Sequence, residues 1–506
     1  MQRIRLGTLD FFLGDLVAGV SAAFVLIPQA LAYASLAGLP PERGLFVAAL
    51  APTAAAFLAS SPYLATGPTA VTSLLTLGAL TALASEGSDE YVALATLLAL
   101  LVGAARVVMG LLHGGMVAYL MSQPVVLGFT TGAGVAIFVS QIPTVLGVEP
   151  TSANPFSAAV GSLTHPGSWE PSAVIVAVGT AAVIIGGRRV HRLFPGILVA
   201  VALAIVFSVA LSYGGPVVGR IESGLPPPTL SFPWSSAPQL LVPALVIALV
   251  GFSEPASIAR RYATLERQRW DPNRELISQG VGNLAAALGG GFPAGGSFSR
   301  SALVRDAGAR TKWAGGITGL VVLVLLPMTP ALSPLPMAFL GATIMVGVRD
   351  LISVEPFLDF RRYAPLQFMV AAATFLLTIV LAPRVEWAVI VGVVFAVGAH
   401  LWREVRLAIP AWTSDRTLHL APKGVLYFAS APSLEGAFSK LLGEHPDATS
   451  VVVHLDGLGR IDLTGALALR ALLEDARQAG LEPTLDGIPP PAAKIIARVI
   501  EGRSDI

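Results

Sequence analysis

The sequence lacks cysteine and carries little charge. Among its 506 residues, 12% are charged and 7% are aromatic. Without cysteine there are no disulfides, thiolate nucleophiles or thiolate metal sites. Lys and Arg number 32 against 31 Asp and Glu, so the net charge of +1 creates no long-range field for nucleic acid. We therefore expect no nucleic-acid partner.

Enzyme motifs are missing as well. The sequence has no zinc-ligand spacing, no phosphate-binding loop ending in Gly-Lys-Ser/Thr and no nucleophile elbow. The glycine clusters at 132–134 and 289–291 lack the strand that a nucleotide-binding fingerprint requires. We expect no catalytic residue, no metal site and no cofactor.

Apolar residues, in contrast, fill most of the chain. They make up 54% of the residues, and the mean hydropathy is +0.73. Since a helix needs about 20 apolar residues to span a bilayer, we predict a polytopic α-helical membrane protein with about fourteen segments. Two of these, starting near Pro68 and Ser297, are too short to cross fully. Their centres are Ala23, Ala51, Leu75, Leu100, Ala133, Val176, Val201, Val246, Leu284, Ala302, Val321, Ala342, Ala373 and Val393.

Loop charges predict the orientation, because loops rich in Lys and Arg stay in the cytoplasm. Basic residues cluster at 188–192, 260–274, 305–312, 349–362 and 403–406. The intervening loops 81–90, 147–171 and 214–238 have almost none, Arg220 being the exception. We expect an even number of spans in the inner (cytoplasmic) membrane, with both termini cytoplasmic.

Two segments share an unusual pattern, a Gly/Pro break followed by a short helix rich in hydroxyl groups. They are residues 66–73 and 289–300, and each follows a polar break in an earlier span, Pro28-Gln29 or Glu254-Pro255. In transporters such paired breaks indicate an inverted repeat with the binding site between its halves. The alternative is that they are simple kinks relieved by neighbouring helices.

A helix that starts at mid-membrane leaves backbone N–H groups unpaired, and these attract an anion together with the positive end of the helix dipole. The first such start offers Thr69 and Ala70, and the second offers Ser297, Phe298 and Ser299. We predict that these residues bind an anionic substrate. Each hydroxyl has an alternative role, since Ser and Thr in membrane helices often bond back to a carbonyl.

Two charged residues accompany the second break. Arg300 is the only cation that the sequence places close to it, and we expect it to attract the anion. Glu254 lies about 9 Å before the first basic residue of the following loop, so it falls within the hydrocarbon depth and is a candidate for proton coupling. The alternatives are a static ion pair between the two, or an Arg300 side chain that reaches the cytoplasmic surface.

In the first span, Gln29 and Tyr33 lie one helical turn apart and present an amide and a phenol on one face. We expect them to line the same site from the side. Plain packing is the alternative for Tyr33.

After Pro410 the composition becomes more charged, and about 95 residues alternate between strand and helix patterns. Residues 424–430 and 449–455 are predicted as strands, and 465–479 and 491–501 as amphipathic helices. We expect a membrane domain over residues 1–410 and a small α/β domain over 411–506.

With these residues in hand, the chain resembles the SulP/SLC26 family of anion transporters over nearly its whole length. The resemblance rests on the order and spacing of four segments: Ile27-Pro-Gln-Ala-Leu-Ala-Tyr-Ala34, Leu39-Pro-Pro-Glu-Arg-Gly-Leu45, Gly67-Pro-Thr-Ala-Val-Thr-Ser-Leu-Leu75 and Pro293-Ala-Gly-Gly-Ser-Phe-Ser-Arg-Ser-Ala302. It implies a seven-plus-seven inverted repeat, a core domain that moves against a gate domain, and a homodimer. It also implies that the third and tenth helices hold the anion between their N-termini, with Gln29 and Tyr33 beside it and Glu254 in cation coupling.

The tail resembles a STAS domain through residues 451–457 and 460–465. Leu463 stands where anti-sigma antagonists of that fold carry a phosphorylated serine, so we expect no phosphoswitch. Ser60-Ser-Pro-Tyr63 also lacks the basic residue that the family usually has before its third helix.

Together these patterns predict a secondary anion transporter that works by alternating access and carries sulfate or a small dicarboxylate such as fumarate or succinate with a proton. The alternatives are a passive anion channel or uniporter, a bicarbonate transporter, a receptor that signals through the tail, and a nucleobase carrier of similar architecture.

Overall fold

The computed structural model describes residues 2–116, 122–190, 194–211, 213–221, 224–226, 228–500 and 502, without the side chains of residues 2–11 and Arg188. Arg192, one of the basic residues behind the predicted orientation, lies outside them, as does Glu501 at the predicted end of the last helix. The chain forms two compact units, residues 1–394 and 395–506.

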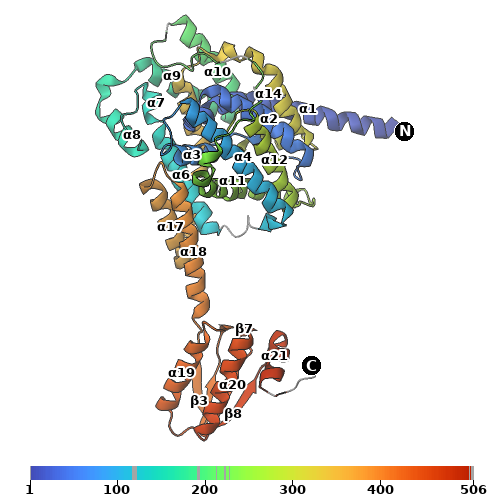
Figure 1. The fold of residues 1–506 in the computed structure, drawn as a ribbon, viewed down its shortest axis with the longest axis vertical. Coiled ribbons are helices and arrows are strands. Elements are labelled where there is room, and N and C mark those ends of the chain that lie inside the picture. The colour runs from blue at the N-terminus through green and yellow to red at the C-terminus, as the bar shows by residue number, and fades with distance from the viewer. Residues whose placement is uncertain are drawn as a thin grey trace. The chain divides into compact units, whose positions relative to one another are not determined.

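Long helices build the first unit (Figure 1). The first half contributes α1 (Gln2–Leu36), α2 (Pro41–Leu58), α3 (Ala70–Leu80), α4 (Asp89–Leu111), α6 (Gln123–Ser140), α9 (Pro171–Val190) and α10 (Gly196–Ala210). The second contributes α11 (Ala237–Leu265), α12 (Pro272–Leu288), α13 (Phe298–Asp306), α14 (Trp313–Leu325), α15 (Met337–Val348), α17 (Pro365–Val380) and α18 (Glu386–Val405), whose last residues belong to the second unit. Each predicted centre lies within one of these helices.

Their length and composition suit a membrane. Within the described residues, seven helices are long and apolar enough to cross one, and α3, α9, α10 and α17 form shorter apolar helices. The two spans predicted to be incomplete are indeed short, because α3 has 11 residues and α13 has 9. The chain is a polytopic α-helical membrane protein.

The helices pack as an inverted repeat. In the core domain, α1 packs on α13 and α14 of the other half, while α11 packs on α3 and α4; α2 packs on α14 in the same way that α4 packs on α12. The remaining helices form the gate domain, where α6 packs on α17 and α9 on both α10 and α15. Pro28 in α1 and Pro255 in α11 lie on matching helices of the two halves, but both helices continue through the proline, so the breaks predicted at Pro28-Gln29 and Glu254-Pro255 do not occur.

Glycine allows the closest of these contacts. A Cβ atom added to Gly103 of α4 would lie 2.9 Å from the Gly280 carbonyl oxygen of α12, and one added to Gly280 would lie 2.8 Å from the Val107 nitrogen. The two backbones therefore touch, as small residues permit in membrane helices. This contact holds the two halves of the core domain together.

Polar contacts gather several helix ends of the core domain at one end of the bundle, here called the basic end. Arg274 at the start of α12 donates to the Leu58 carbonyl at the end of α2 (2.9 Å), and Lys312 before α14 donates to the Phe57 carbonyl (2.6 Å). Asp15 of α1 accepts bonds from the backbone N–H groups of Arg310 and Thr311. Cations at a helix C-terminus are favourable because they oppose the negative end of its dipole.

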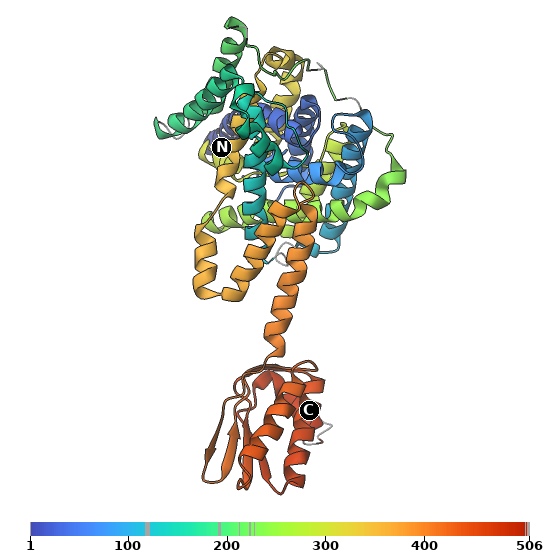
Figure 2. The ribbon, with the colours of Figure 1, turned by 90° about the vertical axis from the view of Figure 1, so that its left-hand side faces the viewer.

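The second unit is an α/β domain with strands on one side and helices on the other (Figure 2). Its main sheet has the order β3 (Ala411–Ser414), β4 (Thr417–Leu420), β6 (Ser450–His454) and β8 (Glu482–Asp486); only β3 is antiparallel to its neighbour. A second pair joins β5 (Gly424–Leu426) to β7 (Leu458–Ile461). The helices are α19 (Ala431–Glu444), α20 (Leu463–Gln478) and α21 (Pro490–Val499).

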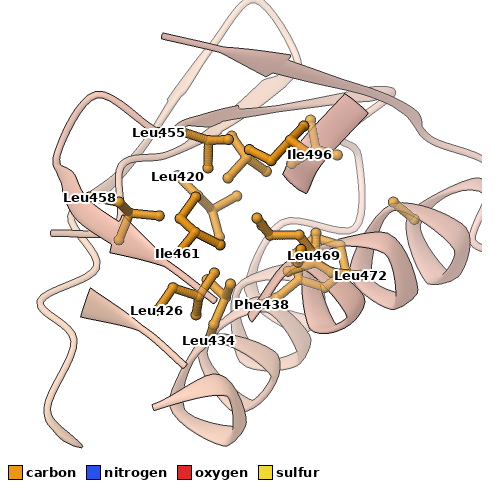
Figure 3. Packing of buried hydrophobic residues seen from close by; sticks show 14 of the residues in the cluster. Leu420, Leu426, Leu434, Phe438, Leu455, Leu458, Ile461, Leu469, Leu472 and Ile496 are labelled. Carbon is orange, nitrogen blue, oxygen red and sulfur yellow. The ribbon is translucent and has the colours of Figure 1, made fainter. Parts of the chain in front are cut away.

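Alternation along the strands builds the core of this unit. Leu418 and Leu420 of β4 and Val451 and Val453 of β6 are fully buried against the helices, and Figure 3 shows Leu420 among the packed side chains. The predicted strand at 449–455 is β6, whereas the one at 424–430 is shorter than predicted, because β5 ends at Leu426. Asp462 begins α20 as its N-cap, accepting a bond from the Gly465 N–H (2.7 Å).

Candidate functional site

The two predicted breaks meet in the middle of the core domain. Thr66 pairs with Gly296 and Gly67 with Gly295 as a short antiparallel ladder, and α3 and α13 start just beyond it. Helices that leave an antiparallel pair in this way have their N-termini close together and run in opposite directions. The structure therefore places the start of α3 beside the start of α13, as the repeat pattern predicts.

Buried amide side chains hold this ladder in place. The Gln279 amide of α12 donates to the Thr66 hydroxyl at 2.7 Å. Asn283, one turn further on, accepts a bond from the Ala294 N–H (2.8 Å) and donates to its carbonyl (3.2 Å). Backbone that is not helical needs such partners inside a membrane protein, because no water is available there. Helix α12 is thus the scaffold of the break before α13.

At the start of α3, Thr69 is the N-cap and accepts a bond from the Thr72 N–H at 3.3 Å. The next hydroxyls bond back to carbonyl groups, which is the alternative role considered for Ser and Thr: Thr72 donates to the Thr69 carbonyl and Thr76 to the Thr72 carbonyl. Among the described residues, the buried Ser73 hydroxyl has no hydrogen-bond partner. Buried hydroxyls are normally satisfied, so this unpaired donor on the first turn of α3, whose start includes Ala70, is a notable feature of the site.

At the start of α13, the Ser297 side chain does not cap the helix, and its hydroxyl lies 3.3 Å from that of Ser299. The first-turn N–H of Phe298 instead donates to the Glu254 carboxylate at 3.3 Å. Glu254 lies on α11 directly before Pro255. A carboxylate of the protein itself therefore occupies the N-terminal anion position of this helix.

Arg300 is buried, with 1% of its surface exposed. Its guanidinium donates to the Gln29 side-chain oxygen (3.1 Å) and to the Pro68 carbonyl oxygen (2.9 Å). Both alternatives from the sequence are therefore wrong: within the described residues it forms no ion pair with Glu254, and it does not reach the surface. Arg300 instead links α13 to α1 and to the break before α3, and its buried Nε has no partner.

Tyr33 is buried on the same helix as Gln29 but faces the gate domain. Its hydroxyl lies 3.7 Å from the position that a Cβ atom of Gly347 in α15 would occupy. The predicted site residues thus come from α1, α3, α11 and α13, and Tyr33 reaches from this group toward α15.

The sequence missed a second cation at this site. The prediction that Arg300 is the only cation near the second break is wrong, because Arg106 of α4 donates to the Ala294 carbonyl inside that break at 2.9 Å. Arg106 is fully buried and also donates to the Ile247 and Ala248 carbonyls of α11. A single arginine in an apolar segment was the available signal, since such a residue is rare without a partner or a function.

Glu275, at the start of α12, is a second residue that the sequence analysis missed. It is fully buried and accepts bonds from the backbone N–H groups of Ser60 (3.1 Å) and Ser61 (2.7 Å) and from the Trp270 ring (3.3 Å). It fixes the segment that leads from α2 to the ladder. We assign it a structural role, because all of its described contacts lie at the basic end.

A cavity of about 760 Å³ leads to this group of residues from the basic end. It lies between α1 and α13 of the core domain and α9 and α10 of the gate domain, and Gln29 and Ser299 line its inner part. Asp306 and Asp350 line it near the helix ends. The cavity reaches the first turn of α13 at Ser299 and the Gln29 side chain of α1.

The opposite end of α3 is closed against the gate domain at Gly78. A Cβ atom there would lie 2.9 Å from the Glu386 carboxylate at the start of α18 and would collide with the Pro383 carbonyl oxygen. Only glycine therefore fits while the core and gate domains make this contact, since backbone atoms do not yield easily.

Replacing Gly78 by valine is expected to open this contact. Because the chain has no cysteine, Ala382→Cys supplies a single buried thiol next to Pro383 as a probe of this contact. We expect a membrane-impermeant maleimide to label this thiol at least about fivefold faster in the Gly78→Val variant, given the usual cost of overpacking. Gly179→Val on the exposed side of α9, where a Cβ atom meets nothing within 4 Å, is the control. Equal labelling rates in the two valine variants would show that Gly78 does not control this closure.

Comparisons with known proteins match the chain to a known family, and it spans about two thirds of the length of the first relatives. The sequence profile described as the sulfate permease family matches residues 12–374, and that of the STAS domain matches residues 408–501. A probable sulfate transporter of Mycobacterium tuberculosis is 36% identical over 368 residues, which are 71% of this chain and 65% of that protein. Probable sulfate transporter 4.2 of Arabidopsis thaliana is 29% identical over 94% of this chain and 76% of its own length.

Solved structures are similar over most of the chain. The murine solute carrier 26 family member A9 anion transporter in its inward-facing state matches with a TM-score of 0.86 at 21% identity, over 97% of this chain and 87% of the other. The transmembrane domain of a cyanobacterial bicarbonate transporter matches with a TM-score of 0.65 at 25% identity, over 76% of this chain and 97% of the other. These likenesses agree with the seven-plus-seven architecture and the C-terminal α/β domain.

Proposed function

We propose that this chain, which belongs to the sulfate permease family, is a secondary active transporter that carries sulfate or a small dicarboxylate of the fumarate and succinate class together with a proton. The anion would bind between the starts of α3 and α13, at Thr69, Ala70, Ser297, Phe298 and Ser299, with Gln29 and Tyr33 at its side. The name of the mycobacterial relative, a probable sulfate transporter, supports sulfate as the first candidate.

The contact between Glu254 and the Phe298 N–H carries the proposal of proton coupling. An ionised Glu254 competes with the substrate, because both are anions that need the positive start of α13. A protonated Glu254 has lost the charge that holds it there, so the amide becomes free for the substrate. Proton binding and anion binding then favour each other, which is the thermodynamic requirement for symport.

Arg300 supplies the charge that the helix starts alone do not. Two helix N-termini are together equivalent to about one positive charge, which is less than a divalent anion carries. The buried guanidinium adds a full charge next to both starts, through its contact with the Pro68 carbonyl. Its unpartnered Nε and the free Ser73 hydroxyl are donors that the anion would satisfy.

The cavity and the Gly78 contact support alternating access. Gln29 and Ser299 line the cavity that extends from the basic end, while the other end of α3 lies against the gate domain. We assign the basic end to the cytoplasm of a cell with the protein in its inner membrane, following the distribution of arginine and lysine. With this assignment, both termini and a STAS domain over 411–506 lie in the cytoplasm. The membrane domain covers 1–410, and we propose that it forms a homodimer.

Uptake by proteoliposomes tests this function. The purified chain is reconstituted and given radiolabelled sulfate, fumarate, succinate or bicarbonate, with and without an inward proton gradient at matched voltage. Accumulation of one anion above equilibrium only with the gradient supports proton symport and names the substrate. Equilibration that ignores the gradient would support a channel or uniporter, and accumulation of bicarbonate would replace the proposed substrate.

Glu254→Gln is expected to separate binding from proton coupling. Glutamine is neutral at every pH, so anion binding should lose its dependence on pH and gradient-driven accumulation should fall at least about tenfold, while exchange of anion against anion continues. Glu266→Gln, which removes an acid whose partner Arg305 lies at the end of α13, is the control for charge. Gradient-driven accumulation that persists in Glu254→Gln would refute the role of this residue.

A further inference from the structure

A second cavity, of about 200 Å³, lies at the basic end of the gate domain between the ends of α9 and α15. Ile184, Ile185 and Val346 form its apolar walls, and Arg189 and Arg349 contribute its charge. Arg189 lies one residue before the end of α9, and Arg349 directly follows α15. We propose that these two arginines bind one tetrahedral oxyanion, sulfate or phosphate, at a site separate from that between α3 and α13.

The charges around the cavity favour an anionic ligand. Two guanidinium groups that line one small cavity repel each other, and an anion between them removes that repulsion. Among the described residues, Arg349 pairs with Asp350: the Arg349 Nε donates a hydrogen bond to the Asp350 carboxylate at 3.2 Å. The two terminal nitrogens of the Arg349 guanidinium therefore remain for a ligand. Arg189 is exposed and has no hydrogen bond or ion pair to another of the described residues. The planar guanidinium suits sulfate and phosphate, which it binds through paired hydrogen bonds.

Size and position narrow the ligand further. A cavity of about 200 Å³ is smaller than the sites that hold drug-sized molecules, and it suits one small oxyanion with a few waters. Ile184 also lines the larger cavity, and Asp350 lies on its wall. An anion held here therefore sits beside the path to the transport site, on helices of the gate domain.

Two sources can supply such an oxyanion. One is free sulfate or phosphate in the cytoplasm, and the other is the phosphate of an anionic lipid headgroup, because both arginines lie at the ends of spans where headgroups are found. The recognition chemistry is the same in both cases. The experiment therefore needs one arm for each source.

The first arm measures equilibrium binding of radiolabelled sulfate to the full chain in dodecyl maltoside, which contains no phosphate. We expect Arg189→Gln/Arg349→Gln to bind one sulfate fewer per chain than the wild type, with the lost site weakened at least about tenfold because both paired contacts are removed. This difference is the same whether or not the transport site itself accepts sulfate, so its outcome is independent of the proposed function.

The second arm counts bound phosphatidylglycerol by native mass spectrometry on the same two proteins. Loss of one lipid in the double variant, with no change in sulfate, would assign the site to a headgroup. The control is Arg361→Gln/Arg362→Gln, which removes two exposed charges of α16 (Glu355–Tyr363) outside the cavity. The proposal fails if the double variant matches the wild type in both arms, or if the control pair causes the same loss. Arg189→Lys/Arg349→Lys, which keeps the charge, is expected to bind with intermediate strength and serves if the glutamine pair is unstable.

Discussion

Replacing Arg300 by alanine is expected to weaken anion binding at least about 100-fold relative to the wild type. The side chain is 1% exposed and brings a full charge next to the starts of both α3 and α13. Its loss also leaves the Gln29 side-chain oxygen and the Pro68 carbonyl without their donor. The measurement is equilibrium binding of the anion identified by uptake, followed by its transport.

Two further variants decide how Arg300 acts. Arg300→Lys keeps the charge but cannot span from Gln29 to Pro68 with a planar fork, so we expect it to recover part of the affinity. Arg305→Gln removes the next cation along α13, which is 36% exposed and paired with Glu266 at 2.7 Å, and it should leave binding nearly unchanged. Normal affinity in Arg300→Ala would mean that the helix starts suffice and that Arg300 is structural.

The length of the apolar stretches allowed the positions of the helices along the chain to be predicted from the sequence. Every predicted centre falls within a helix because a stretch of about 20 apolar residues has few other stable structures in a bilayer. The two interrupted segments were equally clear, since Pro68 and the glycines before Ser297 break a helix at matching places in both halves. Pairing of these breaks followed from the repeat, and the ladder between Thr66 and Gly296 bears it out.

The partners of the charged groups could not be predicted in the same way. Arg106 bonds to carbonyl groups that lie 141 to 188 residues further along the chain, and backbone carbonyls leave no mark in a sequence. For Arg300 the alternatives from the sequence are an ion pair with a carboxylate or a position at the surface. In the structure it donates hydrogen bonds to the Gln29 side-chain amide and to the Pro68 carbonyl. The strands β3, β4, β7 and β8 were not predicted from the sequence, because each has only four or five residues and lacks a long apolar pattern of its own.

Both buried arginines serve the same part of the core domain. Arg106 bonds to the backbone before α13 and Arg300 to the backbone before α3, so each interrupted segment has one guanidinium on a carbonyl oxygen. Carbonyl dipoles thus hold two positive charges around a site proposed for an anion. The two differ in their other hydrogen bonds: Arg300 donates to the Gln29 side chain, which lines the cavity, whereas every hydrogen bond of Arg106 within the described part of the chain goes to a carbonyl group.

Arg106→Leu is accordingly expected to destabilise the fold more than any change at the binding residues. Three charge-assisted hydrogen bonds, at 2.9 to 3.2 Å, join α4 to α11 and to the break before α13. Their loss should lower the free energy of unfolding by about 3 kcal/mol or more, which can be followed as a lower unfolding temperature in detergent. Because Ala294 also bonds to Asn283, the ladder would be loosened rather than lost, so the surviving protein should bind the anion weakly.

A matched pair of controls separates this stabilising role from an effect of charge. Arg361→Leu removes an exposed arginine of α16 and should leave the unfolding temperature unchanged. Arg106→Lys keeps a positive charge, but one ammonium group cannot reach carbonyls of both α11 and the break, so most of the destabilisation should remain. If Arg106→Lys is as stable as the wild type, the charge alone is needed, and the hydrogen bonds to Ile247, Ala248 and Ala294 do not hold the two halves of the core together.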